Sequence, residues 1–195
     1  MQNQRLFSIL ICTLVDRQTQ FKFLYDLLTV QISMYKLENE VEILSCCDNR
    51  EMTIGTKRNK LLDESVGKFI AFIDDDDRVD MEYIKIITQI IKSNPDIDCI
   101  GIKGILTING RNPRTFIHSI KYNSYFERDK VFYRCPNHLN PIRKECIKGI
   151  RFPEKNFSED TDWALQIKDK GVLKTEVMFD KKPLYYYRFS PSINK

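Results

Sequence analysis

Four consecutive aspartates, Asp74 to Asp77, directly follow the apolar segment 68–73. A short apolar run bounded by polar residues is typical of a buried strand, so the four carboxylates would lie where this strand reaches the rim of a sheet. Concentrated negative charge is costly at such a place without a cation, and hard divalent ions prefer oxygen ligands. The cluster therefore predicts a divalent metal site. Side chains alternate along extended chain, so Asp74 and Asp76 would point one way and Asp75 and Asp77 the other, unless the chain turns.

Two other interpretations of the acidic cluster remain open. It could be a solvated acidic turn, with Asp80 as the N-cap of the next helix. An aspartate pair after a strand also serves phosphate transfer in haloacid dehalogenase-like phosphatases. Those proteins carry a small hydroxyl residue or Val and usually Gly-Thr just downstream, whereas Arg78 and Val79 follow here. We therefore favour the metal site.

A second acidic pair, Glu159 and Asp160, stands at the start of a predicted helix from 159 to 170. Ser158 could cap this helix, and Gly171 would end it. Acidic residues in a first turn usually complement the helix dipole, but a carboxylate there can also accept a proton from a reacting hydroxyl. Trp163, one turn further on, could offer a sugar an apolar platform or could belong to the core.

The elements that must position these residues follow from the apolar pattern. Strands are predicted at 6–15, 41–47, 68–73, 97–108 and 184–189, and a further alternating stretch includes Val177 and Phe179. Helical spacing links Phe21, Leu24, Leu28 and Ile32, and likewise Ile84, Ile87 and Ile91. Alternating strands and helices predict an open α/β sheet, with parallel pairing and helices on both faces. Asn109-Gly110 predicts a tight hairpin, so the sheet would be mixed.

Composition narrows the class of protein. The chain has 195 residues, with 42% apolar and 30% charged, which fits one folded domain. The net charge of +4 comes without a polybasic segment, so we expect no nucleic-acid partner. We find no secretory signal and no apolar run of about 18 residues, so we expect a cytoplasmic protein without a transmembrane segment. Six cysteines without a C-x-x-C pair predict no zinc site and no disulfide framework, and mostly buried free thiols, Cys46 and Cys47 among them.

Several segments together resemble the family 2 glycosyltransferases of the GT-A fold. Phe7–Arg17 resembles that family's first strand and nucleotide-contacting turn, with Cys12 where proline is common. Lys57-Arg58-Asn59, followed by 67–77, resembles its Arg-Asn helix and Asp-x-Asp-Asp signature. Segment 157–163 resembles its acceptor-side Glu-Asp motif. The resemblance extends over nearly the whole chain.

The resemblance implies one GT-A-type, Rossmann-like α/β domain over 1–195. Its central sheet would be mixed and mostly parallel, with helices covering both faces. A nucleotide-binding half would occupy about 1–108, and a half with the acceptor site and catalytic base about 109–195.

By the same resemblance, the donor nucleotide would be bound from the first half of the chain. The residues expected to bind it are Thr13, Val15, Arg17, Asp48, Lys57, Arg58, Asp74 and Asp75. Asp48 would meet the base, and Asp74 the ribose or uracil. Lys57 and Arg58, near a helix start, could donate to phosphate oxygens, or could form an exposed helix face. Asp76, with Asp77 as a further ligand, would hold Mn²⁺ or Mg²⁺ between the phosphates.

By the resemblance, the acceptor side of the site would be formed by the second half of the chain. Asp160 would be the catalytic base, Glu159 would orient the acceptor, and Trp163 could contact a sugar. His138, in the segment 136–143, could touch the diphosphate, the sugar or the metal, or could be a structural hydrogen-bonder.

The C-terminal segment 185–192 resembles the family's closing Tyr-Arg strand, where Arg188 and Ser192 would meet phosphates. It lacks the histidine that often completes the metal site, so water and diphosphate, or His138, would supply the remaining ligands.

The function implied is a metal-dependent, inverting transfer of a sugar from a nucleotide donor, a UDP-sugar by family habit, to a hydroxyl acceptor, a glycan. Two alternatives remain: a nucleotidyltransferase, which would release pyrophosphate, and a non-catalytic nucleotide- or sugar-binding module. The segment 10–20 contains no glycine, which disfavours the first alternative because such enzymes use a Gly-rich phosphate loop there. An oligomer or a partner subunit is left open.

Overall fold

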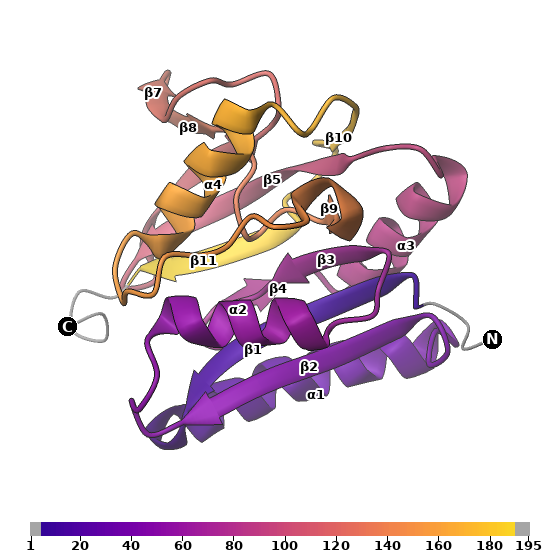
Figure 1. The fold of residues 1–195 in the computed structure, drawn as a ribbon, viewed down its shortest axis with the longest axis vertical. Helices are drawn as coiled ribbons and strands as arrows, with labels where there is room; N and C mark the ends of the chain where they lie inside the picture. The colour runs from indigo at the N-terminus through magenta and orange to yellow at the C-terminus, as the bar shows by residue number, and fades with distance from the viewer. Residues whose placement is uncertain (1–4, 190–195) are drawn as a thin grey trace.

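The computed structural model describes residues 5–189, which form one mixed sheet of eleven strands with helices packed against it (Figure 1). The strands are β1 Phe7–Leu14, β2 Val41–Asp48, β3 Phe69–Phe72, β4 Arg78–Val79, β5 Cys99–Ile108, β6 Arg111–His118, β7 Phe126–Arg128, β8 Val131–Arg134, β9 Ile142–Arg143, β10 Glu176–Phe179 and β11 Tyr185–Phe189. The helices are α1 Gln18–Met34, α2 Ile54–Glu64, α3 Tyr83–Ser93 and α4 Glu159–Lys170, with 3₁₀ turns η1 Val15–Arg17 and η2 Lys144–Ile147. None of these helices has the length and apolar character needed to cross a bilayer.

The main path through the sheet is β2-β1-β3-β9-β5-β6-β8-β7, while β10 and β11 also pair with β5. β1 lies parallel to β2 and β3, as expected for strands joined through helices. Antiparallel pairing then joins β3 to β9 and β5 to β6. The expectation of a mixed sheet is confirmed.

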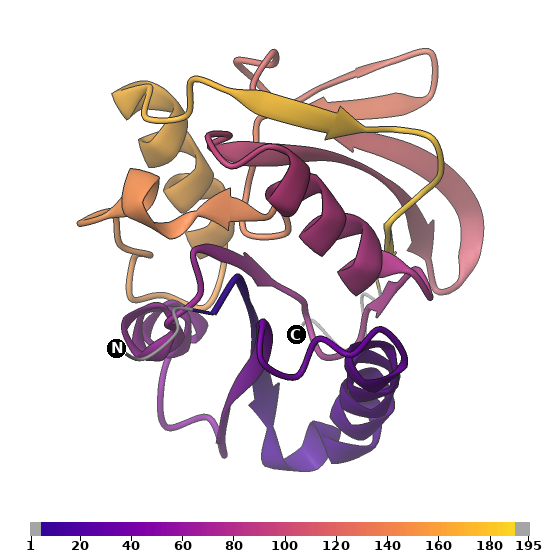
Figure 2. The same ribbon diagram turned by 90° about the vertical axis from the view of Figure 1, so that its right-hand side faces the viewer.

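Two hydrophobic cores cover the two faces of the sheet. Along β1, Phe7 and Ile9 belong to one core, and Leu10 belongs to the other. This alternation is the period of two expected for a strand that is buried on both faces. Helices α1 and α3 pack into the first core, and α2 and α4 into the second. Figure 2 shows the same layers from the side.

The tight hairpin predicted at Asn109-Gly110 is present. Both residues have positive φ, 50° and 74°, and they connect the antiparallel strands β5 and β6. Positive φ at both central residues is the requirement of a type I′ turn, which the Asn-Gly pair meets at low cost.

Two expected helix caps differ from the structure. Helix α4 spans 159–170 and ends at Gly171 with φ 56°, as predicted, but Ser158 makes no side-chain cap hydrogen bond because it adopts a left-handed conformation. Helix α3 starts at Tyr83, with Glu82 as its N-cap. Asp80, two residues before this N-cap, instead accepts from the Glu82 N–H through its Oδ1 at 2.9 Å.

The six cysteines are all free, as expected. Cys46 is buried, but Cys47 is exposed, because alternate residues of β2 face opposite sides. The prediction of burial was therefore wrong for Cys47.

Candidate active site

The acidic cluster and the Glu-Asp pair lie at the same side of the molecule. The arrowheads of β1, β2 and β3 point toward the side on which α4 begins (Figure 1). Ligand sites of open α/β sheets lie outside the carboxyl ends of such strands. The topology therefore brings together residues that are far apart in the sequence.

The chain turns within the acidic cluster. The Asp77 N–H donates to the Asp74 carbonyl oxygen at 3.0 Å. The alternation expected for an extended stretch is therefore broken, and each carboxylate meets a different set of partners.

Asp74 stands between a guanidinium and an imidazole. Its Oδ1 accepts from Arg58 Nη2 at 3.1 Å, and its Oδ2 lies 3.5 Å from His138 Nε2. Burial alone would raise the pKa of Asp74, but His138 and Arg58 outweigh it and hold this pKa well below its usual range. Asp74 is therefore ionised at neutral pH.

Asp75 and Asp76 share one cation. Arg17 Nη2 lies 2.9 Å from Asp75 Oδ1 and 2.6 Å from Asp76 Oδ2. The Thr13 hydroxyl also donates to Asp75 at 2.7 Å. Burial nevertheless raises the pKa of Asp75 to about 6, and it also raises the pKa of Asp76. Raised carboxyl pKa values at a sheet edge are typical of functional sites.

Asp77 is fully buried, and protein donors occupy both of its oxygens. Tyr185 Oη donates to Oδ2 at 2.7 Å, and the Arg188 N–H donates to Oδ1 at 2.8 Å. Burial and the charge of Asp74 raise the pKa of Asp77 well above its usual value. In this structure Asp77 connects the acidic turn to β11. A metal ligand was expected to be open to a cation, whereas both oxygens of Asp77 are occupied by protein donors.

Arg58 is buried and connects the two halves of the site. Its guanidinium lies against the edge-to-face pair of Phe72 and Phe152, at 5.5 and 5.4 Å from their ring centroids. Besides Asp74, it meets Glu159 Oε1 at 3.5 Å. Burial raises the pKa of Glu159, while Arg58 opposes that shift. Because Arg58 is buried, the alternative of an exposed helix face does not hold for this residue.

Lys57 is buried as well. Its Nζ donates to Asp48 Oδ1 at 2.5 Å and to the Thr13 carbonyl at 2.9 Å. The Met52 N–H donates to the other oxygen of Asp48 at 2.7 Å. Lys57 thus fixes the ends of β1 and β2 relative to each other, and its predicted phosphate contact stays a prediction.

His138 joins the acidic turn to the Glu-Asp pair. While its Nε2 faces Asp74, its Nδ1 lies 3.5 Å from Asp160 Oδ2. The Asp160 side chain is 30% exposed, so solvent can reach the carboxylate that was expected to be the base. Glu159, by contrast, is 4% exposed and paired with Arg58, which does not fit an acceptor-orienting role.

The segment that leads to α4 is held against α2 by contacts with its main chain. The Asn59 carboxamide donates to the Phe152 carbonyl and accepts from the Phe152 N–H, both at 2.9 Å. A Cβ at Gly55 would lie 1.8 Å from the Pro153 carbonyl oxygen, so only glycine allows this close approach. These contacts position the segment that leads to Asp160.

Trp163 lies in the core. It is fully buried, and its ring stacks on Phe152 with centroids 4.4 Å apart and planes 9° apart. Of the two interpretations that the sequence left open, the core residue fits this burial.

A divalent cation fits only part of the acidic cluster. Within residues 5–189, no group of three or more His, Cys, Asp or Glu side chains is arranged to hold a metal ion. Mg²⁺ is commonly held by one or two carboxylates plus substrate phosphates, and Asp76, 17% exposed, can serve in that way. Arg17 currently occupies its Oδ2.

Sequence reasoning missed several residues that shape the site. Tyr185 donates to Asp77 and accepts from the Asp74 N–H at 3.1 Å. Burial lowers the pKa of His118 to about 3, so its ring is neutral, and its Nδ1 lies 3.1 Å from Asn140 Oδ1. Tyr185 could have been suspected because it opens a run of three consecutive tyrosines, 185–187, whereas no sequence signal marks the Asn140 contact.

Of the two residues of the C-terminal segment that were expected to contact phosphates, only Arg188 lies within the described residues. The Arg188 side chain is exposed next to the acidic turn. Ser192 lies outside the described residues. Val15 is 57% exposed at the end of β1, where a nucleotide could reach it.

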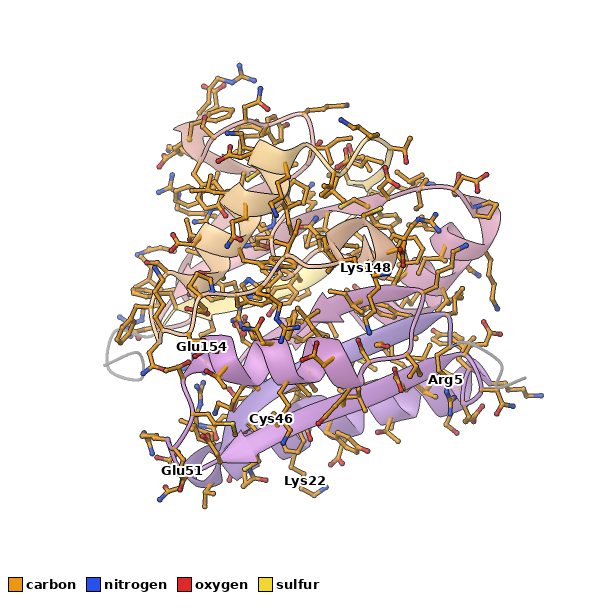
Figure 3. All side chains as sticks on the ribbon, in the orientation of Figure 1. Arg5, Lys22, Cys46, Glu51, Lys148 and Glu154 are labelled. Atoms are coloured by element: carbon orange, nitrogen blue, oxygen red, sulfur yellow. The ribbon has the colours of Figure 1, made fainter. Side chains whose placement is uncertain are left out.

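One cavity of the described structure lies away from these residues. It is a groove of about 660 Å³, lined by segments 62–68 and 143–151. Lys148, one of its lining residues, lies in Figure 3 toward the end of the sheet at which Arg5 precedes β1. The candidate site at the opposite end of β3 is identified by its cluster of carboxylates and not by this groove.

Comparisons with known proteins agree with the resemblance. A family model for Glycosyl transferase family 2 matches residues 36–151, a range that includes the acidic turn and His138 but not Asp160. A search of curated protein sequences gave no match.

Solved structures share the fold. S. aureus TarS 1-349 in complex with UDP-GlcNAc is similar with a TM-score of 0.60 and 18% identity, over 94% of this chain and 58% of that chain. The same fragment in complex with UDP gives a TM-score of 0.59 and 19% identity, over 95% of this chain and 61% of that chain. S. aureus TarS itself is similar with a TM-score of 0.59 and 18% identity, over 95% of this chain and 37% of that chain. This chain therefore spans well under the full length of these structural relatives. The GT-A-type α/β architecture is confirmed.

Proposed function

Because the chain belongs to glycosyl transferase family 2, we propose that it moves the sugar of a nucleotide donor, a UDP-sugar, to a hydroxyl of a glycan acceptor, with inversion at the anomeric carbon. The observation that carries this proposal is the approach of two carboxylates from distant segments. Asp74 at the end of β3 and Asp160 at the start of α4 each lie 3.5 Å from the ring of His138. A donor-side carboxylate and a candidate base thus border one site.

The donor would bind along the carboxyl ends of β1, β2 and β3. Asp48, whose carboxylate is held by Lys57 and the Met52 N–H, is the residue we propose to meet the base. Asp74 is an ionised acceptor for ribose hydroxyls or for uracil. Thr13, Asp75 and Val15 line the same strand ends. We choose UDP because TarS 1-349 is solved with UDP-GlcNAc and with UDP.

Asp76 is the residue we propose for the metal. A bound Mg²⁺ or Mn²⁺ would offset the charge of the departing diphosphate. Arg17 would have to release Asp76, and its guanidinium would then be free to pair with a phosphate. The exposed Arg188 could approach the same anion.

Asp160 is the proposed base. The acceptor hydroxyl must lose its proton as its oxygen attacks the anomeric carbon, and a partly exposed carboxylate in reach can take that proton. Direct displacement by this oxygen inverts the anomeric configuration. Glu159 would act only through Arg58, by keeping the start of α4 near Asp74.

The test is release of nucleoside diphosphate from a panel of UDP-, GDP- and dTDP-sugars, each with and without glycan acceptors, in Mg²⁺ or Mn²⁺. We expect metal-dependent UDP release that Asp76→Ala abolishes and that Asp26→Ala, an exposed aspartate on α1, leaves intact. Full activity in excess EDTA would remove the metal role. Pyrophosphate release from a nucleoside triphosphate would favour a nucleotidyltransferase. UDP binding detected by calorimetry without turnover would favour a non-catalytic binding module.

A further inference from the structure

The imidazole of His138 is buried, and its nitrogens have no hydrogen-bonding partner within residues 5–189. The residue is 4% exposed, and both nitrogen atoms are enclosed. The polar atoms that face them are Asp74 Oδ2 and Asp160 Oδ2, each at 3.5 Å. Leaving two buried nitrogens unpaired is costly, so a reason for this placement is required.

The segment that carries His138 is held in place by several hydrogen bonds. The His138 carbonyl accepts from the Phe72 N–H at 2.8 Å, which fixes it to the end of β3. On one side of it, Asn137 Oδ1 accepts from the Leu139 N–H at 3.1 Å. The backbone of His138 is therefore set independently of its ring.

Asn140 locks the same segment from the other side. Its Oδ1 accepts from the Asn137 N–H at 3.1 Å, and its Nδ2 donates to the Ile100 carbonyl at 3.0 Å. Because Oδ1 is only an acceptor, the neutral His118 must donate to it from Nδ1. Prolines at 136 and 141 flank this stretch. The imidazole is thereby presented between the two carboxylates by a prearranged loop.

The separation of 3.5 Å is longer than a strong hydrogen bond and within ion-pair range. Catalytic hydrogen bonds are often long without substrate and tighten when it binds. With an N–H at each nitrogen, the form in which imidazole offers two donors, small movements of Asp74 and Asp160 toward the ring would satisfy both nitrogens at once. The two sides of the site would then be ordered by one side chain.

We propose that His138 is a positioning residue with two separable duties: its Nδ1 orients Asp160 toward the acceptor hydroxyl, and its Nε2 orients Asp74 toward the donor. This inference rests on the proposed function and assigns the ring to neither the metal nor the diphosphate. The Nδ1 contact governs the rate of proton removal. The Nε2 contact governs how well the donor is held.

Two substitutions separate these duties. In His138→Asn the amide nitrogen can take the place of Nδ1, whereas in His138→Gln it can take the place of Nε2. We expect His138→Asn to keep kcat within about threefold and to raise the KM for the donor about tenfold. We expect His138→Gln to lower kcat about 100-fold, within the usual effect of a general base, and to leave the donor KM within about threefold. His138→Phe should show both losses.

A double-mutant cycle with Asp160→Asn gives the second measurement. If Nδ1 acts through Asp160, His138→Gln should not lower kcat further in the Asp160→Asn background. Equal losses in the Asn and Gln variants, multiplicative effects in the cycle, or an active His138→Phe would each overturn the proposal. Should His138→Gln fail to fold, the donor KM and kcat of His138→Asn decide alone. A wild-type protein that turns over no nucleotide sugar would instead refute the proposed function.

Discussion

Arg58 Nη2 lies 3.1 Å from Asp74 Oδ1, and the same nitrogen lies 3.5 Å from Glu159 Oε1. One buried guanidinium therefore joins the end of β3 to the start of α4. Its charge compensates two carboxylates, and it packs against the rings of Phe72 and Phe152. This contact sets the distance across which the donor and the base would meet.

Arg58→Met should lower the free energy of unfolding by about 3 kcal/mol, because it leaves Asp74 and Glu159 facing each other without a cation. Denaturant unfolding measures this change. The matched control is Arg151→Met, which removes an exposed pair with Asp63 and should cost less than about 1 kcal/mol. Equal losses in the two variants would contradict the role of Arg58.

Asp75 should make stability depend on pH. Burial raises its pKa from 3.8 to about 6, so the folded state binds this proton more tightly than the unfolded state does. The resulting stabilisation is full below about pH 4 and is lost as the pH rises through 6.

Asp75→Asn removes that titration. In EDTA, the stability of the wild type relative to Asp75→Asn should fall by up to about 3 kcal/mol between pH 4 and pH 7, at about 1.4 kcal/mol per pKa unit. A difference that stays flat or rises over this range would show that Arg17 and Thr13, rather than burial, dominate.

Gly55→Ala should displace the segment that leads to α4, because its Cβ would lie 1.8 Å from the Pro153 carbonyl oxygen. We expect a loss of about 2 kcal/mol and a fall in kcat of at least tenfold. Gly110→Ala is the control: it has φ 74° but nothing within 4 Å of the new Cβ, so it should cost stability only. Wild-type kcat in Gly55→Ala would mean that this contact does not position Asp160.

Trp163→Phe tests the core interpretation. Since the indole is fully buried and stacked on Phe152, the substitution should destabilise the protein by about 2 kcal/mol and leave the acceptor KM within twofold. Thermal unfolding and acceptor kinetics give the two values. Unchanged stability with a tenfold higher acceptor KM would instead support the interpretation of Trp163 as an apolar platform for the acceptor sugar.

The long elements could be predicted from the sequence because their signals are local. The apolar run 68–73 contains β3, and the spacing of Ile84, Ile87 and Ile91 marks the buried face of α3. The two-residue strands β4 and β9 carry no such signal. β4 exists through its pairing with β11, in which Val79 lies opposite Tyr185.

The chemistry of the site could be predicted by residue type, but its pairings could not. The four aspartates, Arg58 and Asp160 do meet at one end of the sheet. That Arg58 is buried against two rings, and that His138 stands between two carboxylates, depends on how α2, α4 and the 136–141 loop pack. Such contacts are set by tertiary structure, for which one sequence holds no local signal.

The most direct test of the central claim is the rate of sugar transfer by Asp160→Asn. The control is Asp162→Asn, in the same helical turn, whose carboxylate pairs with Lys155 at the surface. We predict that Asp160→Asn lowers kcat by about 10² to 10⁴, with an unchanged dissociation constant for UDP, and that Asp162→Asn stays within about threefold of the wild type. Asp160→Asn with kcat within threefold of the wild type would contradict Asp160 as the base.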